Sequence, residues 1–325
     1  MGKWYAGVTH CHTNRSDGKY PPEKIVEMAE QRKLDFLMIT DHNRILDRMP
    51  ESQKVTVIFG TELTKNGGHS NYWGVQAPFD DFECESYEDL KEKIALAKSR
   101  GATTSMNHPL CTGCPWRWDK EPEIFDCIEI WNSPQHIDNM ICTDWWADEL
   151  RKGKKIPVVG GSDYHNDYVV TNLMTNPVTY VYAESSSTED ILRAIREGKT
   201  TISAGVGKTL ITITCGDTML GGTAKVNESS VAHVSVKGFK KGHILKVIGS
   251  TGLVFSYIAE KNGDFEKDIP VGNNTFFYAL TDHSVPMLFR VGHNLVMKSR
   301  NHCKPFDPVP RFIYAQTGAI YFEKE

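Results

Sequence analysis

The sequence lacks three features: those that would mark a membrane protein, a nucleic-acid-binding protein and an exported protein. No uninterrupted apolar stretch approaches the roughly 20 residues that cross a bilayer, so a membrane protein is not expected. The 37 basic and 41 acidic residues give a net charge of −4, and no basic tract stands out, so nucleic acid is not favoured as a partner. The first residues lack the apolar core of a signal peptide. We therefore expect a soluble globular protein.

Cysteine is also scarce for the chain length. Eight cysteines in 325 residues are too few for a disulfide scaffold. Without an export signal, reduced thiols and a cytoplasmic location are expected. The pair Cys111-x-x-Cys114 could indicate a zinc or redox site. No second such pair accompanies it, however, so a structural loop is favoured.

Two closely spaced histidines dominate the start of the chain. His10 and His12 directly follow the short apolar run Trp4–Val8. If that run is a strand, both imidazoles point to the same side, because strand side chains alternate with period two. Two adjacent imidazoles suit a divalent metal, and Asp17 on the following loop could add an oxygen ligand. Taken alone, the pair is more simply a polar strand end.

Strand-like and helix-like segments alternate up to about residue 203, which predicts a parallel sheet or barrel. Helices are expected at Ile25–Arg32, Ser86–Gly101, Asp138–Lys152 and Glu189–Glu197. Strands are expected at Trp4–Val8, Leu34–Thr40, Val55–Gly60, Ala102–Met106, Phe125–Trp131 and Ile156–Val159.

Five of these strands end in acidic or histidine residues. Active-site residues of parallel α/β proteins lie at the carboxyl ends of strands. Each residue alone could be a satisfied polar strand end, but their recurrence points to a metal centre. The strand-end residues are His10 and His12, Asp41 and His42, Glu62, His108, and Asp163 with His165.

After about Gly205 the helical periodicity disappears. Short runs rich in β-branched and aromatic residues follow, separated by turn sequences such as Asn262-Gly263, which predicts an all-β sandwich. Its expected strands are Leu210–Thr214, Val231–Val236, Ile244–Ile248, Leu253–Ala259, Thr275–Leu280, Met287–Val291 and Arg311–Ala315. Thr281-Asp282-His283 is interpreted as a turn.

The motifs H-x-H, D-H, an isolated Glu, N-H-P and S-D-x-H occur in this order. In that order and number they resemble the PHP (polymerase and histidinol phosphatase) superfamily of metal-dependent phosphoesterases. The segments Gly68–Asn71, Asn107–Pro109, Ile128–Asn132 and Gly161–His165 look more narrowly like the CehA/McbA-type branch.

The resemblance implies a distorted (β/α)7 TIM-like barrel over residues 1–203, followed by the β-sandwich over 204–325. It implies two or three divalent ions, and the ligand types suit Zn, Mn or Fe. One ion would take His10, His12, Glu62 and Asp163. A second would share Glu62 and take His108, with His69 on a glycine loop as a further ligand. A third would take Asp17, His42 and His165. Asp41 could orient His42 or cap its strand.

The implied chemistry is hydrolysis of a small phosphate ester, because clustered ions lower the pKa of bound water and bind phosphate oxygens. Arg15 and Arg117 are candidates to bind the outer phosphate oxygens, and Lys65 is a weaker one. Asp163 or His165 could protonate the leaving group if it is not fully committed to metal. The alternatives are a carbamate or carboxyl-ester hydrolase, or a catalytically silent metal-stabilised binding protein. The oligomeric state stays open.

Overall fold

The protein is described by a computed structural model covering residues 2–132, 136–167, 173–284 and 311–325. The expected strand Met287–Val291 lies outside the described residues. Within them the fold is mixed α/β, with a 15-stranded sheet that contains parallel pairs and a separate 4-stranded sheet.

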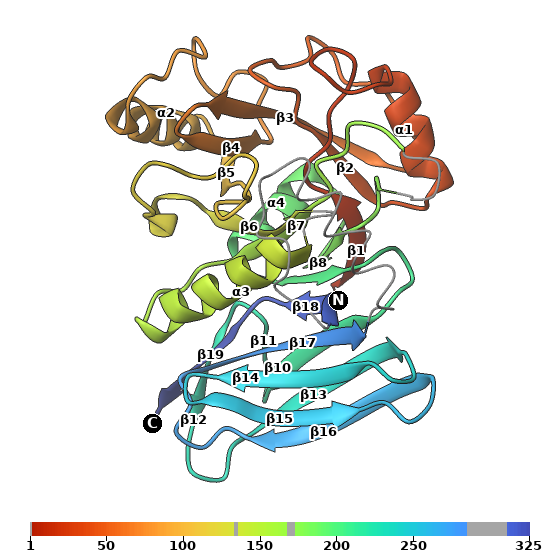
Figure 1. Ribbon diagram of the computed structural model, residues 1–325, viewed down its shortest axis with the longest axis vertical. Helices are drawn as coiled ribbons and strands as arrows, with labels where there is room; N and C mark the ends of the chain where they lie inside the picture. Colours follow the sequence, from red (N-terminus) through yellow and green to blue (C-terminus); the bar gives the residue numbers. More distant parts are fainter. Residues whose placement is uncertain (1, 133–135, 168–172, 285–310) are drawn as a thin grey trace.

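The N-terminal strands occupy one side of the large sheet in the order β1-β2-β3-β4-β5-β6-β7 (Figure 1). Strands β1, β2 and β3 run parallel, as do β5, β6 and β7, whereas β4 is antiparallel to both of its neighbours. On the other side of β1 follow the antiparallel strands β8 and β9. The bounds are β1 (Lys3–Val8), β2 (Phe36–Ile39), β3 (Thr56–Lys65), β4 (Gly68–Trp73), β5 (Thr103–Met106), β6 (Cys127–Asn132), β7 (Val158–Gly161), β8 (Val178–Ala183) and β9 (Thr200–Ser203).

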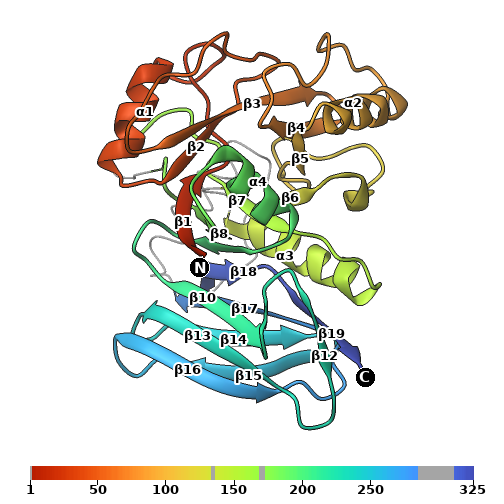
Figure 2. The same cartoon turned by 180° about the vertical axis from the view of Figure 1, so that it is seen from behind.

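Four α-helices pack on these strands within the described residues. They are α1 (Pro22–Gln31), α2 (Tyr87–Ser99), α3 (His136–Arg151) and α4 (Thr188–Arg196), with a short 3-10 helix η1 (Pro122–Ile124). Helix α1 starts with a proline in its first turn, and α2 starts with a capping box between Ser86 and Asp89. Helix α3 packs on β6, and α4 packs on β8, seen most directly in Figure 2. None of the described helices is long and apolar enough to cross a bilayer.

The described residues after β9 form strands, which make up the lower half of Figure 1. Strands β11, β10, β13 and β16 form the 4-stranded sheet, and the others extend the large sheet. The bounds are β10 (Leu210–Cys215), β11 (Thr218–Met219), β12 (Thr223–Val226), β13 (Val231–Phe239), β14 (Ile244–Gly249), β15 (Gly252–Ile258), β16 (Gly263–Pro270), β17 (Phe276–Ser284), β18 (Arg311–Thr317) and β19 (Ile320–Lys324). Asp282 lies within β17 and contacts Arg311 and Lys246, so the prediction of a turn at Thr281–His283 was wrong.

The large sheet runs without interruption from the N-terminal strands into the C-terminal ones. Strand β9 pairs with β18, and Ala315 lies opposite Ser203. One hydrophobic cluster also spans both regions, since Trp146 of α3 packs with its ring 5.0 Å from that of Tyr278 in β17. The two regions are therefore joined through backbone hydrogen bonds as well as through apolar packing.

The sequence did not predict strand β4. It forms a hairpin with β3, in which His69 lies opposite Thr64, so His69 is on a strand and not in a loop. The connection turns at Asn66 and Gly67, and β4 begins at Gly68; a Cβ atom at Gly67 or Gly68 would collide with the ring of Trp118 or Trp116 respectively. Its polar residues Ser70 and Asn71 are buried, which hid the strand from an argument based on apolar runs.

Candidate metal centre

The chain leaves β1 with both predicted histidines buried. The His12 amide donates to the Tyr164 carbonyl (2.9 Å), and the Thr40 amide donates to the Cys11 carbonyl (2.8 Å). These bonds hold the strand end between the segments that follow β2 and β7. The side chains of His10 and His12 are both fully buried, and their ring centroids are 5.1 Å apart. The prediction that the two imidazoles lie side by side is thus met in the structure.

Glu62, in the middle of β3, is surrounded by imidazoles from four segments. Its Oε1 lies 3.3 Å from His10 Nε2, 3.3 Å from His69 Nδ1 and 3.5 Å from His108 Nε2. Its Oε2 lies 2.8 Å from His42 Nδ1. The carboxylate is fully buried. A single carboxylate in this position can contact two ions at once.

Asp163 forms a second meeting point after β7. Its Oδ1 lies 3.0 Å from His12 Nε2, 3.3 Å from His10 Nε2 and 3.7 Å from His165 Nδ1. Asp163 has a φ of 48° and His108 a φ of 29°, in the left-handed region that side chains other than glycine rarely adopt. Backbone strain of this kind clusters at functional sites, where it aims a side chain.

Asp17 lies at the outer edge of the cluster and contacts three histidines. Its Oδ2 lies 3.2 Å from His165 Nε2 and 3.4 Å from His42 Nε2, and its Oδ1 lies 3.8 Å from His12 Nδ1. The side chain of Asp17 is 54% exposed, whereas that of Glu62 is 1% exposed. The cluster therefore runs from a closed interior around Glu62 to an open edge at Asp17, where a substrate can enter.

The side chains fit a set of divalent ions. His10 Nε2, His12 Nδ1 and His108 Nε2 are buried and make no hydrogen bond within the described residues, although carboxylate oxygens lie nearby. Buried polar atoms in folded proteins are nearly always paired, so unpaired imidazole nitrogens facing carboxylates call for a cation. Among the described residues the donor atoms fall into four groups close enough to share an ion, namely His10-His12-Asp163, His10-Glu62-His108, His12-Asp17-His42-His165 and, with a thiol, His69-His108-Cys114.

The two central carboxylates are ionised at neutral pH. Burial raises the pKa of Glu62, but the charges of His10 and His69 outweigh it and hold the pKa well below its usual range. Burial likewise raises the pKa of Asp163, and His10 and His12 reverse that shift. Both groups are therefore present in the anionic form that binds cations.

The sequence predicted no role for Glu129, although its segment Ile128–Asn132 is one of those that resemble the CehA/McbA-type branch. Glu129 is fully buried in β6, and its Oε2 lies 2.9 Å from His10 Nδ1. Asn132 Nδ2 donates to Glu129 Oε1 (2.8 Å) and to Asp163 Oδ2 (3.2 Å). Glu129 thus fixes His10 so that Nε2 faces the cluster, as carboxylates commonly do behind a metal-bound histidine. The available signal was an acid between two isoleucines inside the run Phe125–Trp131.

Asp41 and Asn107 support the cluster in other ways. Asp41 accepts hydrogen bonds from the Thr13 amide, the Thr13 hydroxyl and the Ser16 hydroxyl, each at 2.7 Å. These bonds fix the loop that carries Asp17, and they do not involve His42, which the sequence offered as a partner. Asn107 Nδ2 donates to Glu62 Oε1 (3.0 Å).

We expect Glu129→Gln to weaken divalent metal binding by about 10–100-fold while the protein stays folded, because the amide cannot hold His10 through a charged hydrogen bond. Isothermal titration with Zn²⁺ or Mn²⁺ measures the effect. Glu123→Gln, which alters a partly exposed ion pair with Lys154 (2.9 Å), is the matched control and should bind metal normally. Equal metal affinity in Glu129→Gln and the wild type would contradict the role given to Glu129.

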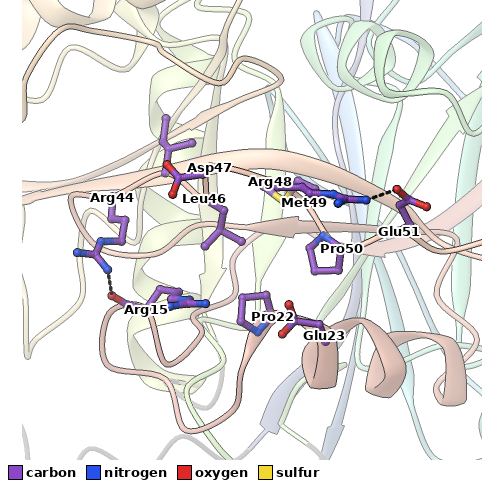
Figure 3. Close-up of a pocket in the computed structure, with 11 residues that line it drawn as sticks. Arg15, Pro22, Glu23, Arg44, Leu46, Asp47, Arg48, Met49, Pro50 and Glu51 are labelled. Atoms are coloured by element: carbon purple, nitrogen blue, oxygen red, sulfur yellow. Dashed lines mark hydrogen bonds and ion pairs between the residues drawn. The ribbon is translucent and has the colours of Figure 1, made fainter.

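The predicted phosphate-binding arginines lie apart from one another. Arg15 lines a hollow of about 730 Å³ together with Arg44 and Arg48, beside the start of α1 (Figure 3). Arg44 Nη1 donates to the Arg15 carbonyl (3.2 Å), and Arg48 pairs with Glu51 (2.5 Å). Within the described residues, none of the predicted metal ligands lines this hollow. It adjoins the centre along the chain, since Arg15 lies between His12 and Asp17.

The other two predicted cations lie at the turn end of the β3–β4 hairpin. Arg117 is exposed, and its backbone amide donates to the Gly67 carbonyl (2.7 Å). Lys65 Nζ lies 4.0 Å from Glu83. Neither side chain contacts a predicted metal ligand within the described part of the chain. The structure therefore brings the metal ligands together but does not bring Arg15 and Arg117 together.

The fold is shared with a solved two-domain protein. The protein, from Bacteroides vulgatus, contains a predicted PHP-like metal-dependent phosphoesterase; it aligns with a TM-score of 0.53 at 18% identity, over 87% of this chain and 91% of that one. The lesion-specific endonuclease EndoQ from Pyrococcus furiosus aligns at 0.44 and 15% identity, over 67% of this chain and 63% of the other. A candidate metal-dependent phosphoesterase from Bifidobacterium adolescentis aligns at 0.36 and 15% identity, over 58% and 94%. No protein-family model and no curated protein sequence matches the chain.

Proposed function

We propose that the chain is a metal-dependent hydrolase of the PHP type that acts on small phosphate esters. In this proposal its N-terminal strands form the distorted (β/α)7 barrel of that superfamily, in its CehA/McbA-type branch, and residues 204–325 form the accompanying β domain. The structural neighbours named as phosphoesterases support the general class. The residues at the site support the chemistry.

A single observation carries the proposal: two buried imidazole nitrogens without hydrogen-bond partners among the described residues, His10 Nε2 and His108 Nε2, face the buried, ionised carboxylate of Glu62, and His10 Nε2 also faces the ionised carboxylate of Asp163. Such an arrangement is costly in an ordinary core, because each unpaired buried polar group lowers stability by about 1–3 kcal/mol. A set of bound cations removes that cost. A purely structural role would not require the donors to extend to an exposed edge at Asp17.

The ligand sets we propose are those that the PHP resemblance implies, and the contacts around Glu62, Asp163 and Asp17 support them. His10, His12, Glu62 and Asp163 would hold one ion, and Glu62, His108 and His69 a second. Asp17, His42 and His165 would hold a third, at the open edge. When bound, the ions supply a hydroxide near neutral pH and neutralise charge on the phosphate oxygens.

The chain's own residues prepare these ligands. The carbonyl oxygen of Asp163 can only accept, so His165 Nδ1, 2.9 Å away, carries the proton and Nε2 is left free to bind an ion. Asp163 is held in its anionic form. We therefore assign both residues to ion binding, and not to protonation of the leaving group. Glu129 orients His10, and the bonds to Asp41 keep Asp17 at the edge.

We place the part of the substrate beyond the reacting phosphate in the hollow lined by Arg15, a residue two positions before Asp17 in the chain. Arg15 and Arg44 both line it, and Arg44 Nη1 donates to the Arg15 carbonyl (Figure 3). Guanidinium groups bind phosphate oxygens in a planar, two-point geometry that suits this task. Leu46, Met49 and Pro50 give the same hollow an apolar wall. A small organic phosphate matches such a lining.

The experiment that tests the function combines metal analysis with a substrate screen. Purified protein should contain at least two divalent ions per chain, and metal-loaded protein should hydrolyse phosphate monoesters or diesters in preference to carboxyl esters and carbamates. Chelator treatment should remove the activity, and Zn²⁺ or Mn²⁺ should restore it. Less than one transition metal per chain after reconstitution would overturn the proposal. Selective carboxyl-ester or carbamate cleavage would favour that alternative chemistry, and bound metal without any hydrolysis would favour a binding protein.

A further inference from the structure

Two thiols lie against one of the proposed metal ligands. Cys111 Sγ and Cys114 Sγ are 3.1 Å apart, and Cys114 Sγ is 3.6 Å from His108 Nδ1. Cys111 is buried, whereas Cys114 is partly exposed to solvent. The sequence favoured a structural loop for this pair, but the geometry is that of a dithiol ready to close. A disulfide bond joins sulfurs at about 2.05 Å, so closure requires a shift of roughly 1 Å.

The loop couples the thiols to His108 through its backbone. The Cys111 amide donates to the His108 carbonyl (2.9 Å), and the Cys114 amide donates to Cys111 Sγ (3.4 Å). Thr112 anchors the turn on α3, where its amide and hydroxyl bind Asp138 at 2.8 and 2.7 Å. Thr112 thus fixes the turn between the two thiols. Once Cys114 Sγ is bonded to Cys111 Sγ, it has no proton and is a weaker hydrogen-bond partner, so its contact with His108 Nδ1 is weakened.

We infer that Cys111 and Cys114 form a reversible disulfide that weakens divalent metal binding by releasing His108. In the reduced chain, His108 is held from both sides: Cys114 lies at Nδ1, and Glu62 Oε1 lies 3.5 Å from Nε2. A histidine ligand depends on the partner of its second nitrogen for its orientation, and loss of such a partner costs about 10–100-fold in metal affinity. The disulfide leaves Nδ1 without that partner. This inference rests on the proposed metal centre.

The reaction balances with a low-molecular-weight disulfide, such as oxidised glutathione, as the oxidant. Cys114, the more accessible of the two thiols, gives up the proton that it shares with Cys111 Sγ and attacks a sulfur of oxidised glutathione, and one glutathione leaves as a thiolate. Cys111 then attacks the Cys114 sulfur of the mixed disulfide, which breaks the bond to glutathione and forms the internal bond. The two cysteine thiols lose two protons and two electrons, and these convert oxidised glutathione into two molecules of reduced glutathione.

The test uses the full chain loaded with Zn²⁺. After incubation with oxidised glutathione, peptide mapping should show a Cys111–Cys114 disulfide, and the metal dissociation constant should rise by about 10–100-fold. Dithiothreitol should reverse both changes. In Cys111→Ser the internal disulfide cannot form. Oxidised glutathione can still modify Cys114 in this variant, and dithiothreitol reverses that modification. Apart from this effect, the metal affinity of the variant should not change on oxidation. Cys84→Ser, which removes a buried thiol remote from His108, should respond as the wild type does.

Two results would overturn the inference. One is that both thiols stay reduced in excess oxidised glutathione. The other is that the disulfide forms while the metal dissociation constant stays unchanged. These results differ from failure of the proposed function. A reduced chain that binds no divalent ion would overturn both, whereas tight metal binding that is indifferent to oxidation would overturn only the role of the dithiol.

Discussion

Glu62→Gln is expected to lower kcat/KM for phosphate ester hydrolysis by at least about 1,000-fold, which corresponds to about 4 kcal/mol of transition-state stabilisation. The carboxylate is the contact shared by His10, His42, His69 and His108. Its replacement by an amide removes the negative charge that two of the proposed ions share. The side chain keeps its size, so the core of β3 should stay packed.

Three measurements check this expectation: steady-state kinetics, metal content by elemental analysis, and far-UV circular dichroism, which should stay close to that of the wild type. His10→Ala should give the same loss, because it removes a ligand that contacts both Glu62 and Asp163. Glu88→Gln, on the exposed surface of α2, is the matched control and should leave all three measurements unchanged. Activity above roughly a tenth of the wild-type value in both variants would refute the assigned roles.

Much of the site was predictable because most of its ligands follow apolar runs that the sequence marks clearly. The apolar runs before His10, Asp41 and Glu62 form the parallel strands β1, β2 and β3. The carboxyl ends of parallel strands meet at one edge of a sheet, so order along the chain becomes proximity in space. No such rule applied to Arg15 and Arg117, because both lie in loops.

The missed features depend on contacts between distant segments. Glu129 acts on His10 across 119 positions of sequence, and no local pattern indicates that pairing. Strand β4 is recognisable only from its partners, since its buried polar residues pair with β3 and β5. The alternation of apolar and polar residues identifies strands that bury apolar side chains. It does not identify a strand whose buried side chains are the polar residues of the site.

The loss of helical periodicity near Gly205 indicates where helices stop, but it could not reveal that the large sheet continues past that point. The backbone of β9 is hydrogen-bonded to β18, which begins more than a hundred positions later in the chain. Thr143 of α3 donates to Gln316 Oε1 (3.0 Å), and both side chains are buried. The predicted division at residues 203 and 204 therefore separates a region of alternating strands and helices from a region of strands. Cutting the chain there would break a shared sheet and a shared core.

A fragment of residues 1–203 is accordingly expected to be mostly insoluble when expressed alone. Its β9 would present Thr201, Ile202 and Ser203 as an unpaired edge, and α3 would lose the cover that Tyr278 gives to Trp146. Exposed strand edges and apolar surface of this kind promote aggregation. Solubility is measured as the fraction of fragment left in the supernatant and monomeric on size-exclusion chromatography, compared with the full chain.

Co-expression of residues 204–325 provides the control, because it supplies β18 as the pairing partner of β9 without restoring the peptide bond between residues 203 and 204. Rescue of solubility by the second fragment would show that the shared sheet, and not the connecting peptide, holds the two regions together. The refolded 1–203 fragment should still bind divalent metal, since all the proposed ligands lie within it. A soluble, monomeric and fully active 1–203 fragment would show instead that β9 and α3 are stable without their C-terminal partners. Loss of metal binding in a soluble fragment would mean that the C-terminal region contributes to the centre.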